Sequence, residues 1–153
     1  MQTASPRRVI VGTNARGQSA VFSDATVALR ADRPNGGEAY QLWSQDVLPS
    51  PTDYDGASHT EMFALPPAEG AVVRTYTIQP EASESFSEAV GLHTSGALFV
   101  ITVISGRMRV DLEVEPVELG PSETIVIRGN MHDLRNPFDE PVSLVYTAFR
   151  LTD

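Results

Sequence analysis

Short runs of alternating apolar and polar residues dominate the chain, and they constrain its fold more than any other feature. Such runs predict β-strands. We find no convincing apolar period of 3.6 residues, which argues against a long amphipathic helix. The predicted strands cover residues 8–11, 19–24, 72–78, 98–105, 107–114, 123–128 and 142–151. Short strands at this spacing, joined by turn-rich segments, predict an all-β antiparallel sandwich or barrel.

Residues 32–70 interrupt this pattern. The segment is rich in proline and glycine, yet it carries Tyr40, Trp43, Tyr54, Met62 and Phe63. A disordered linker would lack such side chains. We therefore predict an arm or lid that packs on the barrel or on a second subunit. In this division residues 1–70 hold the N-terminal strands and the arm, residues 71–153 hold the barrel, and the whole chain is one structural domain.

Charge and composition exclude several partners and chemistries. The net charge of −9 opposes binding to nucleic acid, because phosphate contacts need clustered basic residues. All 11 basic residues are arginine, which excludes Schiff-base chemistry by lysine. The absence of cysteine excludes disulfides and thiolate ligands. No apolar run is long enough to cross a membrane, and we see no signal-peptide pattern at the start. We expect a cytoplasmic protein that does not bind membranes.

Two of the three histidines flank predicted strands in comparable settings. His93 precedes a strand in EAVGLHTSGALFV, and His132 follows one in RGNMHDLRN. His59 lies in the predicted arm, where a simple loop residue is the plainest interpretation. His132 could also be a turn histidine bonded to the backbone, with Asn136 as a turn residue.

The second of these stretches resembles a motif of the cupin superfamily. That motif has the form G–x5–P–x–G–x2–H–x3–N. Residues 128–136 match its later half, with Gly129, His132 and Asn136 in register. The segment 121–123 takes the place of its Pro-Gly-Asp turn, so that Ser122 replaces a glycine. The resemblance spans residues 72–149. It implies a small single-domain cupin: a double-stranded β-helix, or jelly-roll barrel, with an N-terminal arm.

The first cupin motif is only partly matched. His93 aligns with its first histidine and Gly106 with its closing glycine. In metal-binding cupins this motif also supplies a second histidine and a carboxylate. Here Ser95 takes the histidine position, and Phe99 or Val100 takes the carboxylate position. Two imidazoles alone make a poor site for zinc or iron. The resemblance therefore implies a degenerate metal motif, and we expect no cofactor.

Strand parity predicts an apolar cavity. If His93 points inward, Ser95, Phe99 and Ile101 share its face, because side chains alternate along a strand. Apolar walls with a few polar groups at one end are typical of a ligand pocket. The opposite face of the same strand is apolar as well. Since one small barrel cannot cover all of this surface, we predict a homodimer.

Further substrate contacts can be assigned from neighbouring segments. Arg74 and Tyr76 share one face of the strand at 72–78. If they point inward they could orient a carboxylate or a phenol, and if outward they are ordinary solvent residues. Asn136 and Trp43 complete the candidate substrate contacts, although Trp43 is also typical of a core or a dimer interface.

Three functions fit these residues. The first is a non-oxidative lyase or isomerase of secondary metabolism, in which His93 and His132 act as acid and base on a largely apolar small molecule. Dehydration, isomerisation, cyclisation and decarboxylation are the reactions that the resemblance implies. The second is a metal-dependent dioxygenase or lyase, with His59 or Glu88 added to the two histidines. The third is a cupin that binds a small molecule without catalysis. The residues favour the first.

Overall fold

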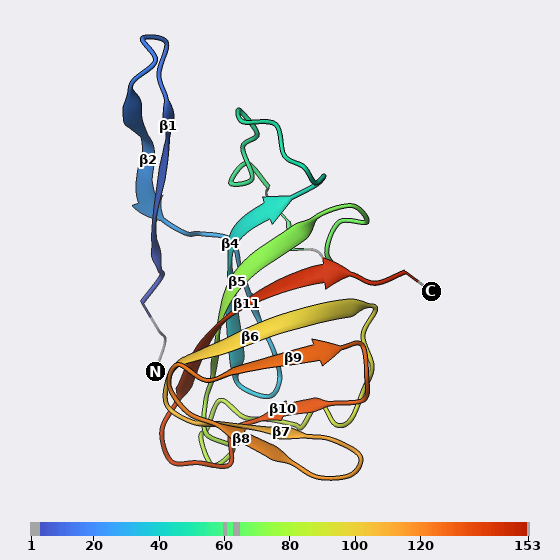
Figure 1. Cartoon of the computed structure of the whole chain (residues 1–153). Coiled ribbons are helices and arrows are strands. Elements are labelled where there is room, and N and C mark those ends of the chain that lie inside the picture. The colour runs from blue at the N-terminus through green and yellow to red at the C-terminus, as the bar shows by residue number, and fades with distance from the viewer. Residues whose placement is uncertain (1–3, 60, 63–64, 153) are drawn as a thin grey trace.

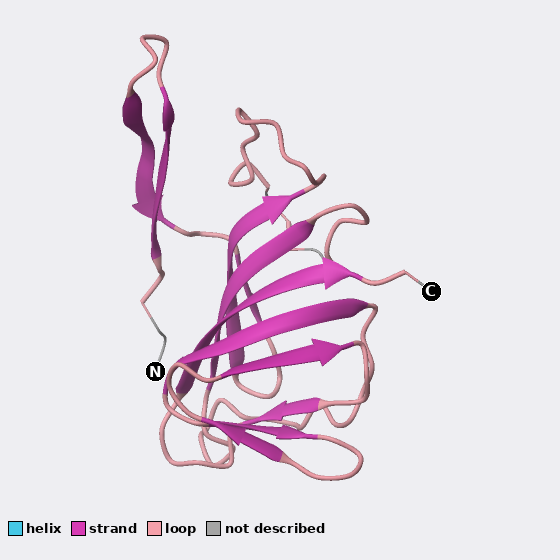
Figure 2. Ribbon diagram, viewed as in Figure 1, coloured by secondary structure: helices cyan, strands magenta, loops and turns pink. Residues whose placement is uncertain are grey.

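The computed structural model describes residues 4–59, 61–62 and 65–152, and every regular element in them is a β-strand (Figure 2). The all-β prediction is therefore confirmed. No helix among these residues could cross a lipid bilayer. The strands are β1 (Arg7–Thr13), β2 (Ser19–Thr26), β3 (Arg30–Asp32), β4 (Gly37–Gln45), β5 (Ala71–Ile78), β6 (Ala97–Ser105), β7 (Met108–Asp111), β8 (Val117–Leu119), β9 (Thr124–Arg128), β10 (Asp133–Arg135) and β11 (Val142–Arg150).

The described strands form three sheets with antiparallel pairings (Figure 1). The largest has six strands in the order β3-β4-β5-β11-β6-β9. A three-stranded sheet in the order β10-β7-β8 lies across from it. The third is the hairpin of β1 and β2. The order is not sequential, since β11 pairs with both β5 and β6, and this places strands from distant parts of the chain beside one another.

The core lies between the two larger sheets. Ile101 and Leu144 from the six-stranded sheet are each 1% exposed, and Met108 and Val110 from the smaller sheet are 0% exposed. These residues belong to one apolar cluster. Burying a side chain of this kind contributes roughly 1.5–3 kcal/mol. Inward residues alternate with outward ones along β6, as the sequence pattern predicts.

Strand β4 differs from the arm expected over residues 32–70. It lies inside the six-stranded sheet between β3 and β5. A bulge between Gln41 and Trp43 breaks its alternation, which hides the strand from a pattern search. Gly37 is needed there, because an added Cβ would meet the Tyr76 hydroxyl. The rest of the segment is irregular loop, and Phe63 lies outside the described residues.

The β1–β2 hairpin projects away from the body of the molecule (Figure 1). Within the described chain it pairs with no other strand. Its apolar side chains are largely exposed: Val11 at 66%, Val21 at 62% and Phe22 at 60%. Arg7 and Asp24 form an ion pair across it at 2.8 Å. A lone two-stranded hairpin is marginally stable in water, so this element lacks the packing that stabilises the rest of the fold.

Left-handed backbone occurs at the turns that carry the motif glycines. Gly106 and Gly129 both have φ of 77°. Ser122 has φ of 69° and is the only non-glycine with positive φ among the described residues. The serine thus occupies the position at which the cupin turn carries glycine, and it adopts the glycine conformation despite its Cβ.

Candidate functional site

A cavity of about 460 Å³ opens between the inward face of the six-stranded sheet and strand β10. Its volume is within the usual range for small-molecule sites. Seven sequence-predicted site residues line it: Arg74 and Tyr76 on β5, Phe99 and Ile101 on β6, His93 and Ser95 just before β6, and His132. The lining residues are Ala31, Arg33, Asn35, Ala39, Met62, Arg74, Tyr76, Val90, His93, Ser95, Phe99, Ile101, His132, Asp133, Leu134 and Tyr146.

The two histidines lie side by side in the wall of this cavity. They form an isolated antiparallel bridge, in which the His93 amide donates to the His132 carbonyl at 3.0 Å and the His132 amide donates to the His93 carbonyl at 2.9 Å. Their ring centroids lie 4.6 Å apart, with planes inclined by 53°. The backbone bridge therefore brings the two imidazoles close together.

Hydrogen bonds to the backbone fix the tautomer of both rings. His93 Nδ1 lies 2.8 Å from the Gly91 carbonyl, and His132 Nδ1 lies 2.7 Å from the Asn130 carbonyl. A carbonyl oxygen only accepts, so each Nδ1 carries the proton. In the neutral rings Nε2 is then the lone-pair nitrogen, and we find no hydrogen bond to either Nε2 among the described residues. Each ring thus presents one basic nitrogen.

Burial tunes the acidity of this cluster. His132 is 3% exposed, and its pKa lies below the ordinary histidine value, first because of burial and then because of nearby His93. The Asn130 carbonyl and Asp133 partly oppose this shift. Asp133 is 6% exposed, and burial raises the pKa of its carboxyl group. Neutral His132 suits a general base, whereas Asp133 retains its proton to a higher pH than a solvated aspartate.

A row of aromatic rings connects the histidines to the other end of the cavity. Phe99 lies edge-on to His132, with centroids 6.1 Å apart, and edge-on to Tyr146 at 5.6 Å. Tyr146 in turn lies edge-on to Tyr76 at 6.5 Å. These side chains come from β6, β11 and β5, which are adjacent in the sheet. An apolar, flat wall therefore runs from the histidine pair into the sheet.

Arg74 lies opposite Tyr146 in the pairing of β5 with β11. It is 6% exposed, and its Nε and Nη2 both donate to Gln41 Oε1, at 3.1 and 2.9 Å. Its Nη1 donates to the Tyr146 hydroxyl at 3.3 Å. Beside it, the Tyr76 hydroxyl bonds to Asn35 at 3.4 Å, and burial raises the Tyr76 pKa. Gln41 on β4 and Tyr146 on β11 thus help to orient the guanidinium.

Asn136 and Trp43, which were predicted as substrate contacts, lie outside the lining of this cavity. Asn136 is 0% exposed, and its amide donates to the carbonyls of Ile78 and Glu140, so it ties β5 to the turn before β11. Trp43 lies after the β4 bulge, outside the cavity lining, and donates to Gln45 at 3.1 Å. Both side chains are structural, because tertiary partners occupy their polar groups.

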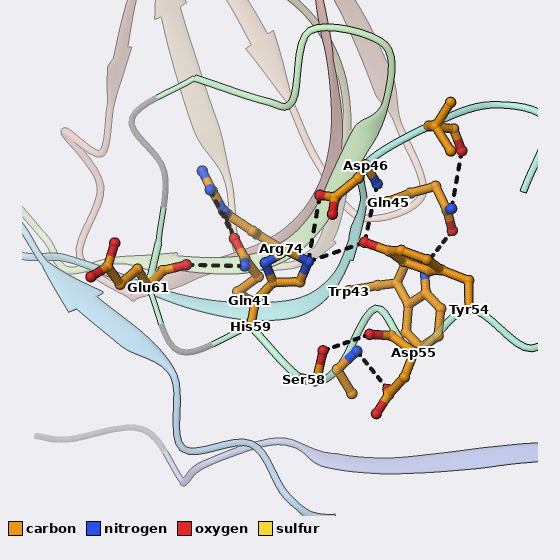
Figure 3. Close-up of polar contacts among 12 residues, drawn as sticks. Gln41, Trp43, Gln45, Asp46, Tyr54, Asp55, Ser58, His59, Glu61 and Arg74 are labelled. Atoms are coloured by element: carbon orange, nitrogen blue, oxygen red, sulfur yellow. Dashed lines mark hydrogen bonds and ion pairs between the residues drawn. The ribbon is translucent and has the colours of Figure 1, made fainter.

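His59 and Glu88 also lie away from the cavity lining. His59 Nε2 is 3.1 Å from the Tyr54 hydroxyl and 3.5 Å from the Asp46 carboxylate (Figure 3). Tyr54 packs edge-on against Trp43, with centroids 6.3 Å apart. This cluster fastens the loop after β4 to the strand. Neither His59 nor Glu88 joins the histidine pair as a third ligand.

Several cavity residues were missed from the sequence. Asp133 directly follows His132, and its placement depends on the short strand β10, which has no clear pattern. Tyr146 could have been found, since the strand predicted at 142–151 alternates and its inward residues are recognisable. Met62 and Arg33 come from loops, where parity gives no information.

Comparison with known proteins identifies the fold. No family model matches the sequence, and no curated protein matches it. Solved structures do match. The cupin domain of Cnp3 from Schizosaccharomyces pombe aligns with a TM-score of 0.55 at 12% identity, over 96% of this chain and 89% of that one. A cupin 2 conserved barrel domain protein from Salinispora arenicola aligns with a TM-score of 0.50 at 13% identity, over 78% and 81%. The chain has a cupin fold. A candidate ethanolamine utilization protein Q from Salmonella typhimurium also aligns, with a TM-score of 0.54 at 12% identity, over 98% and 100%.

Many cupins bind a metal ion through a group of histidine and carboxylate side chains. Among the described residues no group of three His, Cys, Asp or Glu side chains is arranged to hold an ion. His93 and His132 offer two imidazole nitrogens, and the ring of Phe99 lies beside His132. Zinc and iron sites normally use three or more protein ligands. The residues present therefore do not fit a tight metal site.

Proposed function

We propose that this chain is a small-molecule enzyme in which His93 and His132 form an acid–base pair for a non-oxidative reaction. The observation that carries the proposal is the matched geometry of the two rings. Both bind a backbone carbonyl through Nδ1, both line one cavity, and their centroids are 4.6 Å apart. A structural turn histidine needs only the first of these features.

The pair is suited to hold a single proton. Burial is the main cause of the lowered pKa of His132, and nearby His93 lowers that pKa further. Two imidazolium cations at this separation would repel each other. Neutral His132 then accepts a proton from carbon through Nε2, while protonated His93 donates one through its own Nε2. Such catalysis contributes roughly 10²–10⁴-fold in rate.

The reaction class follows from where the second proton goes. Donation to a departing hydroxyl gives dehydration, with water as the leaving group. Donation to another carbon of the same substrate gives isomerisation, and the two histidines exchange roles. The proton is then returned between turnovers by solvent. Both reactions conserve oxidation state, so neither needs an oxidant or a reductant.

Hydrogen–deuterium exchange tests this proposal before the product is known. Ligands found by a thermal-shift screen of small organic acids are incubated with the protein in D₂O, and deuterium incorporation at carbon is followed by NMR. We expect exchange with the wild-type chain and at least a 100-fold slower exchange with His132→Asn. His59→Asn is the matched control and should exchange normally, because His59 lies outside the cavity. A ligand that binds but neither exchanges nor reacts would favour the non-catalytic binding function.

A further inference from the structure

We propose that a second cavity, at the base of the β1–β2 hairpin, binds a small aliphatic carboxylate through Arg8. This cavity has a volume of about 410 Å³. It lies between the hairpin base, β4 and the loop after β4, and it shares no lining residue with the cavity of the histidine pair. The site goes beyond the proposed function and does not depend on it.

The lining of this second cavity contains a guanidinium and no carboxylate, although the chain is acidic. Arg8 and His59 line it, and no aspartate or glutamate among the described residues does. The Asp46 carboxylate lies 3.5 Å from His59 Nε2 (Figure 3), and it forms no ion pair with Arg8. On a chain of net charge −9, such a lining is a local site of attraction for an anion.

The Arg8 side chain has no charged partner among the described residues. Its Nη1 donates to the Leu42 carbonyl at 2.9 Å, and this is the only hydrogen bond that the side chain makes with them. Its Nε is enclosed by protein and has no hydrogen-bond partner. Arg7, one residue earlier, instead pairs with Asp24 at 2.8 Å. The charge of the partly buried Arg8 is therefore poorly compensated, and its Nη2 is left to donate to an anion.

The walls of the second cavity favour an aliphatic ligand with one negative charge. Val27, Leu29 and Ala57 contribute apolar side chains, and no phenylalanine, tyrosine or tryptophan in the described part of the chain lines the cavity. A single guanidinium matches a single carboxylate. A phosphate monoester carries a charge of roughly −1.5 to −2 at neutral pH, which one arginine does not balance. A short-chain carboxylate therefore fits the lining better than a phosphate does.

Gln41 connects the second cavity with the first. It lines the second cavity, and its Oε1 accepts a hydrogen bond from Arg74, which lines the first. A binding experiment must therefore show which cavity an acid occupies. Backbone amide shifts in NMR spectra can do so, because residues 26–29 and 56–57 lie in the lining of the second cavity, whereas Ser95 and Ile101 lie in that of the first.

Hexanoate and hexanamide test the site on the unmodified protein, because they share a chain and differ at the group assigned to Arg8. Titration calorimetry at low salt should show hexanoate binding the wild-type chain about ten- to hundredfold more tightly than hexanamide. Hexanoate should shift the amide signals of residues 26–29 and 56–57. Arg8→Gln should abolish the preference for the acid. Arg16→Gln, which removes one guanidinium from the exposed hairpin turn, should keep it.

Ala57→Leu provides a second test if Arg8→Gln disturbs the hairpin. The larger side chain occupies part of the cavity and removes no charge, and the backbone amide of residue 57 can still donate to Asp55. It should weaken hexanoate binding about tenfold or more. Equal affinity for acid and amide, no binding of hexanoate, or shifts confined to the first cavity would overturn the proposal. Inorganic phosphate binding more tightly than hexanoate would overturn the choice of a carboxylate.

Discussion

His93 and His132 are joined by both of their backbone hydrogen bonds, and each ring is held by a backbone carbonyl at Nδ1. The spacing of the two imidazoles is therefore set by the bridge together with these two ring contacts. Side-chain substitutions at either position should therefore change the chemistry of the pair more than the shape of the cavity.

Replacing His132 by asparagine should separate its structural contact from its chemistry. The asparagine amide can take the place of Nδ1 and donate to the Asn130 carbonyl, but it has no group at the position of Nε2. We expect the free energy of unfolding to change by about 1 kcal/mol or less. His132→Ala, which removes that bond from a residue only 3% exposed, should lose about 1–3 kcal/mol. If His132 lay exposed at the rim of the cavity, His132→Ala would lower the free energy of unfolding by less. Urea denaturation measures both, and an active His132→Asn variant would contradict the role of Nε2.

The lowered pKa of His132 predicts the pH dependence of catalysis. The base must be neutral, so the rate should fall on acidification with a midpoint below the ordinary histidine pKa of about 6.5. Stability should follow the same direction. The unfolded chain binds more protons than the folded chain between these two pKa values, so the free energy of unfolding falls as the pH drops through this window. The raised pKa of Asp133 has the opposite effect: between the pKa of this carboxyl group in the unfolded chain and its higher pKa in the folded chain, the free energy of unfolding rises as the pH drops. His132→Asn should remove the histidine contribution, and an NMR titration midpoint above 6.5 would contradict the prediction.

Ser122→Gly should stabilise the protein. Ser122 has φ of 69°, a conformation that is strained for a residue with Cβ by about 1–2 kcal/mol. Its amide donates to the Val103 carbonyl, and glycine preserves that bond. After allowance for the greater freedom of glycine in the unfolded chain, we expect a gain of about 0.5–1 kcal/mol. Ser122→Ala is the control and should give no gain, because alanine keeps the Cβ. Thermal melting distinguishes the two.

Protein purified without chelator should contain well under one equivalent of zinc, iron, manganese, nickel or copper. The reason is the donor set: Ser95 and Phe99 stand where metal-binding cupins have ligands, and His59 is bound to the loop cluster. Elemental analysis measures the content. Dialysis against EDTA should leave ligand turnover unchanged, and a stoichiometric metal whose loss abolishes turnover would support the metal-dependent alternative instead.

The projecting hairpin predicts a homodimer. It exposes the apolar side chains of Val11, Val21 and Phe22, which a second copy of the chain could cover. The hairpin also carries three arginines and one aspartate, so its positive charge is attracted to a second chain of net charge −9. Light scattering at micromolar concentration should give twice the mass of one chain. Phe22→Asp should give monomers. Val114→Asp, at a loop residue that is 95% exposed, should stay dimeric. A monomeric wild-type chain would refute this.

The inward set of β6 could be predicted because a strand has a period of two and its apolar residues obey it. Phe99 and Ile101 of β6 accordingly line the cavity, and so does Ser95 just before the strand. Strand β4 could not, because its bulge changes the parity in mid-strand. The meeting of His93 with His132 depends on strand order, which local pattern does not encode. The partners of Asn136 and Trp43 could not be predicted either, because the hydrogen bonds that their polar groups make are visible only in the folded structure.

The loop after β4 supplies two parts of the cavity from outside the sheet. Met62 lies in its wall, and the Glu61 carbonyl accepts a hydrogen bond from the Gln41 amide, whose oxygen holds Arg74. The part of the cavity wall formed by this loop can therefore vary independently of the barrel strands. Laboratory evolution confined to residues 46–70 could change which small molecules the cavity accepts while leaving His93, His132 and the strands around them untouched.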